Sequence, residues 1–305
     1  MKNILIVGLG SIAKKHILAI NTVFPEAKIH ALRTNKSTNE NDISEYTSFD
    51  EIVTPLDLVI ISNPTYKHHQ TIENCLVFDC PILIEKPVLI STQNSDSLIE
   101  KINETQTYVA CNLRFHPCIE FLKKYFSSNT PQVNEINIYC GSYLPAWREN
   151  TNFRENYSAN AAMGGGVHLD LIHELDYCTW IWGFPKSSNS FKTSHSSLAI
   201  NAVDYAHYVL EYPNFIATIT LNYFRLTTKR EIEIVFDQDI WTIDLLKAKI
   251  TNNRNEIVFE DPFYNVSQTY IKQMEYIKHA LEKKQPFMND IKEALNVLKI
   301  CNDER

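Results

Sequence analysis

The sequence predicts an α/β protein of two parts: a doubly wound parallel sheet over residues 1–116 and an α+β domain with an open, mostly antiparallel sheet over residues 117–305. Short apolar runs alternate with helical stretches in the first part. The second part has longer runs in which apolar and polar residues alternate. The chain has only seven glycines, and five of them form two groups, Gly8/Gly10 and Gly164–Gly166. In a chain with so few glycines, we expect each of them at a position where the backbone geometry requires glycine.

Strands and helices alternate through the first domain. The expected strands are 3–7, 28–32, 56–61, 82–84 and 108–111, and the expected helices are 11–22, 66–78 and 95–104. Continuous apolar runs are typical of parallel strands that are buried on both faces. This order therefore predicts a parallel sheet covered by helices.

The second domain has strands with a period of two, expected at 135–139, 203–212, 215–224 and 230–236. In the last of these, Ile232 and Ile234 alternate with Glu231 and Glu233. Half-buried antiparallel strands have this pattern, so the polar face is expected to meet solvent or a partner subunit. The last helix of the chain is expected to pack back on the first domain.

Composition excludes several classes of protein. A net charge of −7 does not indicate the excess of positive charge that binds nucleic acid or an anionic membrane. No apolar stretch approaches the ~20 residues of a membrane span. The short apolar N-terminus does not fit a signal peptide, and seven scattered cysteines suit reduced, mostly buried thiols. We expect a cytoplasmic protein without a bound metal.

The first glycine group follows a predicted strand and opens a predicted helix, reading Gly8-x-Gly10-x-x-Ala13. Gly8 would permit the tight turn, and Gly10 would let the backbone approach a pyrophosphate. The free N–H groups of Ser11 and Ile12 at the helix start would bind it. This context predicts a Rossmann domain that binds NAD or NADP; a purely structural turn is the alternative.

The segment after the second strand bears on the choice of cofactor. NAD-binding domains usually place an acid there, ~20 residues beyond the glycines. Here Arg33, Thr34, Lys36 and Ser37 come first, with no acid until Glu40. These residues favour a 2′-phosphate and hence a slight preference for NADP; solvated loop charges are the alternative.

Two further strand ends are expected at the same crevice, because ligands bind outside the carboxyl ends of parallel strands. Ser62, Asn63 and Pro64 follow one strand, and Glu85 and Lys86 follow the next. Lysine in that place can donate a hydrogen bond to a substrate hydroxyl or to the cofactor. A surface Lys-Pro turn is the alternative.

The second glycine group precedes a predicted helix that carries Asp170, His173 and Tyr177 along one stripe. A carboxylate three residues before a histidine can orient and polarise it, which suits a general base near neutral pH. An ordinary Asp–His surface pair on a capped helix is one alternative. A metal is another, although Asp170, His173 and His168 supply few ligands.

Five segments together resemble the glucose-fructose oxidoreductase/inositol dehydrogenase (Gfo/Idh/MocA) family: Gly8–His16, Ser62–His69, Glu85–Pro87, Asn112–Pro117 and Gly164–Tyr177. The resemblance implies a Rossmann domain followed by an α/β domain whose open sheet forms homodimers or homotetramers. It also implies that Lys86 lies near the nicotinamide and precedes a cis proline. His68 joins the residues expected to bind the cofactor.

The resemblance extends to the substrate. Residues 143–154 are similar to the branch found in bacterial surface-sugar gene clusters, which implies a sugar or a nucleotide-activated sugar. Arg148 and Arg154 would hold a phosphate or carboxylate, and Trp147 would stack on a sugar face. Arg114 is also expected to bind substrate. Loop arginines that face solvent or form structural ion pairs are the alternative.

These observations predict an NAD(P)-dependent dehydrogenase or reductase acting on CH–OH groups. Lys86 and His173 would handle the proton, and Asp170 would orient His173. Family members often have three residues between this Asp and His, whereas here only two intervene, which leaves their division of labour open. Two rivals remain: redox-assisted elimination or glycoside cleavage on the same fold, and a non-catalytic dinucleotide or sugar sensor.

Overall fold

The computed structural model describes residues 1–35, 43–148 and 151–304, which divide into two compact units. Unit 1 contains Met1–Asn112 and Val266–Leu298, and unit 2 contains Leu113–Asn265 and Lys299–Arg305. The boundary expected at residue 116 differs from this division by a few residues. Residues 266–298, placed by the sequence in the second domain, fall within unit 1.

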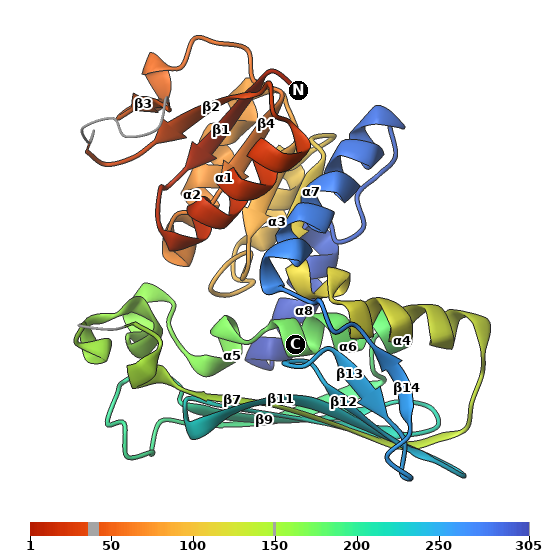
Figure 1. Ribbon diagram of the computed structural model, residues 1–305. Coiled ribbons are helices and arrows are strands. Elements are labelled where there is room, and N and C mark those ends of the chain that lie inside the picture. Colours follow the sequence, from red (N-terminus) through yellow and green to blue (C-terminus); the bar gives the residue numbers. More distant parts are fainter. Residues whose placement is uncertain (36–42, 149–150, 305) are drawn as a thin grey trace. The chain divides into compact units, whose positions relative to one another are not determined.

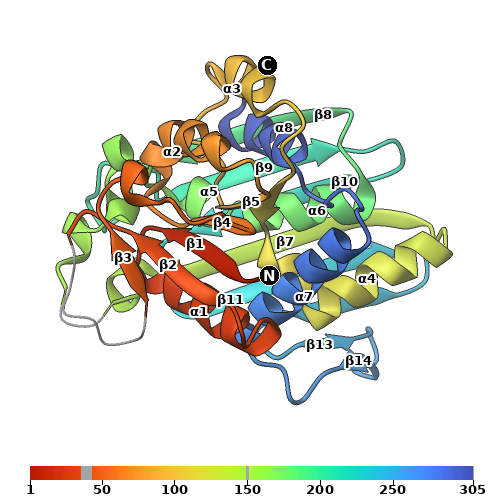
Figure 2. The same cartoon turned by 90° about the horizontal axis from the view of Figure 1, so that it is seen from above.

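Unit 1 is built on a six-stranded parallel sheet in the order β3-β2-β1-β4-β5-β6. The strands are β1 (Asn3–Val7), β2 (Lys28–Leu32), β3 (Ser44–Tyr46), β4 (Leu58–Ile61), β5 (Ile82–Glu85) and β6 (Thr107–Ala110). Ile4, Ile6 and Ile60 are fully buried, as expected for strands covered on both faces. The strand order reverses beside β1 (Figure 2), so the doubly wound sheet is confirmed.

Helices cover both faces of this sheet. They are α1 (Ser11–Val23), α2 (His68–Cys75), α3 (Ser95–Ile102), α7 (Val266–Glu282) and the first part of α8 (Ile291–Asn302). In Figure 2, α1 and α7 lie on one face of the sheet and α2 and α3 on the other. His16 of α1 meets the ring of Tyr270 of α7 edge-on at 5.9 Å. This packing explains why α7 belongs to unit 1 although it follows unit 2 in the sequence.

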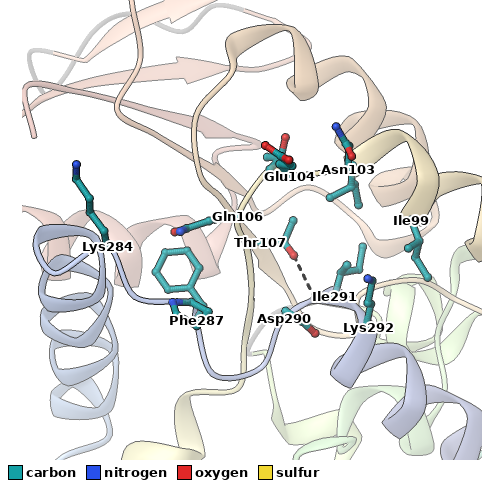
Figure 3. Close-up of a pocket in the computed structure, with 13 residues that line it drawn as sticks. Ile99, Asn103, Glu104, Gln106, Thr107, Lys284, Phe287, Asp290, Ile291 and Lys292 are labelled. Carbon is teal, nitrogen blue, oxygen red and sulfur yellow. Dashed lines mark hydrogen bonds between the residues drawn. The ribbon is translucent and has the colours of Figure 1, made fainter.

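The segment before α8 protects the edge strand β6. The N–H of Val109 donates to the backbone carbonyl of Asn289 at 2.9 Å, and the side-chain amide of Asn289 donates to the carbonyl of Val109 at 2.7 Å. The N–H of Ile291 donates to the hydroxyl of Thr107 at 3.2 Å (Figure 3). Pairing of this kind satisfies backbone groups that an exposed edge would offer to another chain.

Unit 2 contains an eight-stranded sheet in the order β14-β13-β12-β11-β7-β10-β9-β8. The strands are β7 (Val133–Tyr143), β8 (Ser187–Thr193), β9 (Tyr205–Glu211), β10 (Ile216–Asn222), β11 (Phe224–Phe236), β12 (Ile240–Asp244), β13 (Lys249–Thr251) and β14 (Ile257–Glu260). Only β7 and β10 pair in parallel; the other neighbours are antiparallel. The mostly antiparallel sheet is therefore confirmed.

One face of this sheet carries helices and the other is open. The helices are α4 (Pro117–Ser128), α5 (Val167–Asp170) and α6 (His173–Trp182) (Figure 1). Ile232 and Ile234 point to the covered face and are fully buried, while Glu231 and Glu233 alternate with them. In the described part of unit 2, no helix covers the opposite face.

All seven cysteines are buried and none forms a disulfide. Among the helices of residues 1–35, 43–148 and 151–304, none combines the length and the apolar character that crossing a bilayer requires.

Candidate active site

The first glycine turn joins β1 to α1 with a geometry that only glycine adopts easily. Gly8 has φ +90°, and a Cβ built on it would lie 2.8 Å from the backbone N and Cα of Asn63. A Cβ on Gly10 would meet no atom within 4 Å. Gly10 is the N-cap of α1 and makes no side-chain cap. Gly8 is thus required by the fold, whereas Gly10 leaves open space in front of the helix N-terminus, where Ser11 and Ile12 begin α1.

A cavity of about 560 Å³ opens beside this turn. Its walls include the last residues of β1 and β2, Val7 and Leu32, and Asn63 and Pro64 after β4. It therefore lies at the carboxyl ends of the strands, next to the point where strand order reverses, which is where open α/β sheets bind ligands. A smaller cavity of about 290 Å³ lies near the amino end of β6 (Figure 3), away from that edge.

Ser62 and His68 hold the segment after β4 in place. The Ser62 hydroxyl donates to the carbonyl of Gly8 at 2.7 Å. The two ring nitrogens of His68 lie 3.0 Å from the carbonyl of Asn63 and 3.1 Å from that of Val88. Burial lowers the pKa of His68, and its hydrogen bonds to these carbonyls oppose that shift. His68 thus ties the turn after β4 to the segment after β5, a contact different from the cofactor contact expected for it.

Glu85 anchors the turn that carries Lys86. Its carboxylate lies 2.7 Å from Nε2 of the fully buried His16 on α1, and it also accepts the N–H of Lys86 at 3.2 Å. The Lys86–Pro87 peptide is cis, as the family resemblance implies. These contacts occupy the Glu85 carboxylate inside unit 1 and fix the backbone of Lys86; the cofactor contact expected for Glu85 stays a prediction.

Arg33 and Thr34 line the same cavity, together with Lys67, which sequence reasoning missed. The Arg33 guanidinium forms an ion pair with Glu45 of β3, with 3.0 Å between Nη1 and Oε1. Lys36 and Ser37, expected to assist Arg33, lie outside the described residues. Glu45 could not be found from the sequence, because nothing local marks a three-residue edge strand as the partner of Arg33.

In unit 2, the glycine-led segment forms two short helices instead of the single helix predicted. Asp170 ends α5 and His173 begins α6. Leu171 between them has φ −104° and ψ +29°, outside the helical range. The prediction that Asp170 and His173 share one helical stripe is therefore wrong.

Two tyrosines donate hydrogen bonds to the Asp170 carboxylate. The hydroxyls of Tyr157 and Tyr223 lie 2.5 Å from its two oxygens. Burial first, and then the charge of Asp170, raises the pKa of both tyrosines, so both remain protonated donors. Tyr223 packs edge-on against Trp147, with ring centroids 5.3 Å apart. The sequence offered no signal for either tyrosine, because Tyr157 and Tyr223 lie 13 and 53 residues from Asp170, outside its own helix.

Arg114 is part of the core of unit 2. Its Nε and Nη2 donate to the two carboxylate oxygens of Asp176 at 3.0 and 2.7 Å, and its side chain is fully buried. The guanidinium also lies over the ring of Trp180. This bidentate pair gives Arg114 a structural role, which corrects the substrate-binding role expected from the sequence.

The other expected substrate residues lie at the surface of unit 2. Trp147 is 39% exposed, and its indole N–H donates to the hydroxyl of Ser142. Arg148 donates to the side chain of Asn156 at 3.2 Å, and Arg154 donates to the carbonyl of Leu198 at 3.0 Å.

The parallel sheet, the glycine turn and the cavity at the strand ends define unit 1 as a nucleotide-binding Rossmann domain. Among the described residues, no group of three or more His, Cys, Asp or Glu side chains is arranged to hold a metal ion. Residues 2–113 match the family model described as "Oxidoreductase family, NAD-binding Rossmann fold". The match confirms that this N-terminal part of the chain resembles the Gfo/Idh/MocA family.

Curated relatives match over part of their length. An inositol 2-dehydrogenase of Corynebacterium glutamicum (strain R) is 24% identical over 214 residues, which are 63% of this chain and 59% of the relative. A UDP-N-acetylglucosamine 3-dehydrogenase of Acidithiobacillus ferrooxidans is 28% identical over 127 residues, which are 39% of this chain and 40% of the relative. The chain thus spans less than two thirds of the curated relatives it matches.

Solved structures share the fold over nearly the whole chain. UDP-N-acetylglucosamine 3-dehydrogenase GnnA from Acidithiobacillus ferrooxidans has a TM-score of 0.78 at 18% identity, covering 99% of this chain and 95% of that one. Levoglucosan dehydrogenase, in complex with NADH and levoglucosan, has a TM-score of 0.84 at 14% identity, with the same coverage. At these identities the likeness shows the fold alone.

Proposed function

We propose that this protein is an NAD(P)-dependent oxidoreductase that transfers a hydride between the nicotinamide and a hydroxyl or carbonyl carbon of a sugar or nucleotide-activated sugar. The observation that carries the proposal is the open space at Gly10, in front of the N-terminus of α1 and beside a cavity at the strand ends. The relatives named as inositol and UDP-N-acetylglucosamine dehydrogenases support the substrate class.

The residues of unit 1 fit a dinucleotide. The uncapped start of α1 offers N–H donors to a pyrophosphate, and Gly8 lets the chain turn close to Asn63. Bound there, the nicotinamide would supply or accept the hydride. Arg33 and Thr34 at the cavity favour NADP, and the proposed preference is slight because Arg33 is paired with Glu45.

We assign the transfer of the substrate hydroxyl proton to Lys86 and His173. Glu85 fixes the backbone of Lys86, which helps a lysine keep one geometry for proton transfer. Asp170 is kept as the third proposed residue of this group, with its carboxylate held by Tyr157 and Tyr223. Trp147, Arg148 and Arg154 are proposed to bind the sugar and any phosphate it carries.

We also propose that a second copy of the chain packs on the open face of the eight-stranded sheet. Apolar side chains are exposed there at Phe191, Val209 and Ile216. On the same face, Glu135 lies near the start of β7, and Lys229 of β11 lies opposite Gly141, near the end of β7. A two-fold axis through the face would bring opposite charges together. Sedimentation equilibrium is expected to give a mass of at least two chains, falling toward one for Ile216→Asp; a monomeric wild type at micromolar concentration would contradict this.

A binding titration followed by a substrate screen tests the activity. NADH and NADPH are titrated into the protein by nicotinamide fluorescence, and inositols, sugar phosphates and UDP-sugars are then screened by cofactor absorbance. Binding with a lasting absorbance change supports the proposal. Substrate conversion without a lasting change indicates redox-assisted elimination, and binding without any conversion indicates a sensor. Failure to bind either dinucleotide refutes the proposal.

A further inference from the structure

The Arg33 side chain already has a carboxylate partner inside unit 1. Arg33 follows β2 and lines the cavity beside the glycine turn. Its Nη1 lies 3.0 Å from Oε1 of Glu45, and the two side chains are 29% and 9% exposed. An ion pair at this depth is screened less by solvent than one on the surface.

The edge strand β3 holds this pair in register. Glu45 lies opposite Ala31 in the parallel β2–β3 pairing. The N–H of Arg33 donates to the carbonyl of Tyr46, the next residue of β3, at 3.0 Å. Backbone and side chain of Arg33 are therefore both bonded to β3, so the position of the guanidinium is set by that strand.

A guanidinium beside a carboxylate has little net charge to offer a second anion. The 2′-phosphate of NADP would share the guanidinium with Glu45 and be repelled by the same carboxylate. The 2′-hydroxyl of NAD carries no charge and would meet neither difficulty.

We propose that Glu45 is a specificity-determining residue, which offsets the attraction of Arg33 for a 2′-phosphate and keeps the affinities for NAD and NADP close together. This inference rests on the proposed dinucleotide binding. It assigns Glu45 a positioning role, since it acts through Arg33. Its removal should therefore change the ratio of the two affinities, whereas a merely structural residue would change both alike.

The variant Glu45→Gln tests the proposal, because it removes the charge and keeps the size and hydrogen-bonding ability of the side chain. Kd values for NADPH and NADH are measured by fluorescence titration without any sugar. The affinity for NADPH is expected to rise about tenfold relative to NADH, equivalent to about 1.4 kcal/mol. Glu45→Ala should move the ratio in the same direction, and thermal unfolding verifies that both variants are folded.

Two controls isolate the ion pair. Asp50→Asn removes the same charge from the short helix η1 (Phe49–Glu51), which borders the cavity through Phe49. This control should leave the ratio within about twofold, because an exposed charge is screened by salt. In an Arg33→Gln background, Glu45→Gln should no longer change the ratio.

The outcomes separate this inference from the proposed function. An unchanged or lowered NADPH:NADH affinity ratio in Glu45→Gln overturns the inference alone. The same is true if the ratio rises equally in the Arg33→Gln background, because Glu45 would then not act through Arg33. If wild type binds neither dinucleotide, the proposed function and the inference both fall.

Discussion

Replacing Lys86 by alanine is expected to lower kcat by about 10²–10⁴-fold, the usual contribution of a positioned proton donor or acceptor. Lys86 follows β5 directly, and its backbone is fixed by Glu85, which in turn contacts His16 of α1. The loss should appear in kcat for whichever sugar the screen identifies. Initial rates of cofactor reduction or oxidation measure it.

A second lysine of unit 1 provides the matched control. Lys101 is 58% exposed and pairs with Glu73 on α2, so Lys101→Ala removes the same charge without touching the glycine turn. Its kcat should equal that of wild type. If Lys86→Ala also turns the substrate over at the wild-type rate, the proton role of Lys86 is wrong.

Removing the carboxylate of Asp176 is expected to lower the free energy of unfolding by about 3–5 kcal/mol, because it deprives a buried guanidinium of its bidentate partner. Both side chains are almost completely buried, at 0% exposure for Arg114 and 3% for Asp176. Urea denaturation of Asp176→Ala, followed by circular dichroism, measures the loss.

An exposed ion pair of the same unit is the comparison. Lys247 is 76% exposed and pairs with Asp244, so Lys247→Ala should give no resolvable change in stability. Equal stability of Asp176→Ala and wild type would contradict the structural role of Arg114 and reopen its role in substrate binding.

The fold could be predicted because its signals are local. Buried parallel strands such as β1 and β4 are continuous apolar runs, and the alternation in β11 marks a half-buried antiparallel strand. The edge strand β3 was missed, because three residues are too few to show a periodic pattern. The inclusion of α7 in unit 1 depends on its packing against α1, which no local pattern encodes.

The candidate site could be predicted only in part, for the same reason. Glycine geometry at Gly8 follows from a local motif, and the structure gives it the expected turn. The partner of Arg114, Asp176, is 62 residues away in the sequence, and the partners of Asp170, Tyr157 and Tyr223, are 13 and 53 residues away. Sequence reasoning could identify the charged residues, but only the fold decides whether a charge faces a ligand or a buried partner. Hence Arg114 was misjudged and Tyr223 was missed.

The break between α5 and α6 could not be predicted from the sequence either. Apolar residues continue at helical spacing through Leu171, so the pattern favoured one uninterrupted helix. The backbone leaves the helical range at Leu171, and Asp170 turns to Tyr157 and Tyr223 instead. The spacing of the apolar residues therefore does not show where the helix breaks.

The central claim is that a dinucleotide binds in front of α1, and Gly10→Val tests it most directly. Its Cβ would meet no protein atom within 4 Å, so the variant should fold with a melting temperature near that of wild type. The added side chain would stand where the pyrophosphate approaches, so affinity for NADH and NADPH should fall at least ~100-fold, equivalent to ~2.7 kcal/mol. A folded Gly10→Val protein that binds either dinucleotide as tightly as wild type would contradict the account.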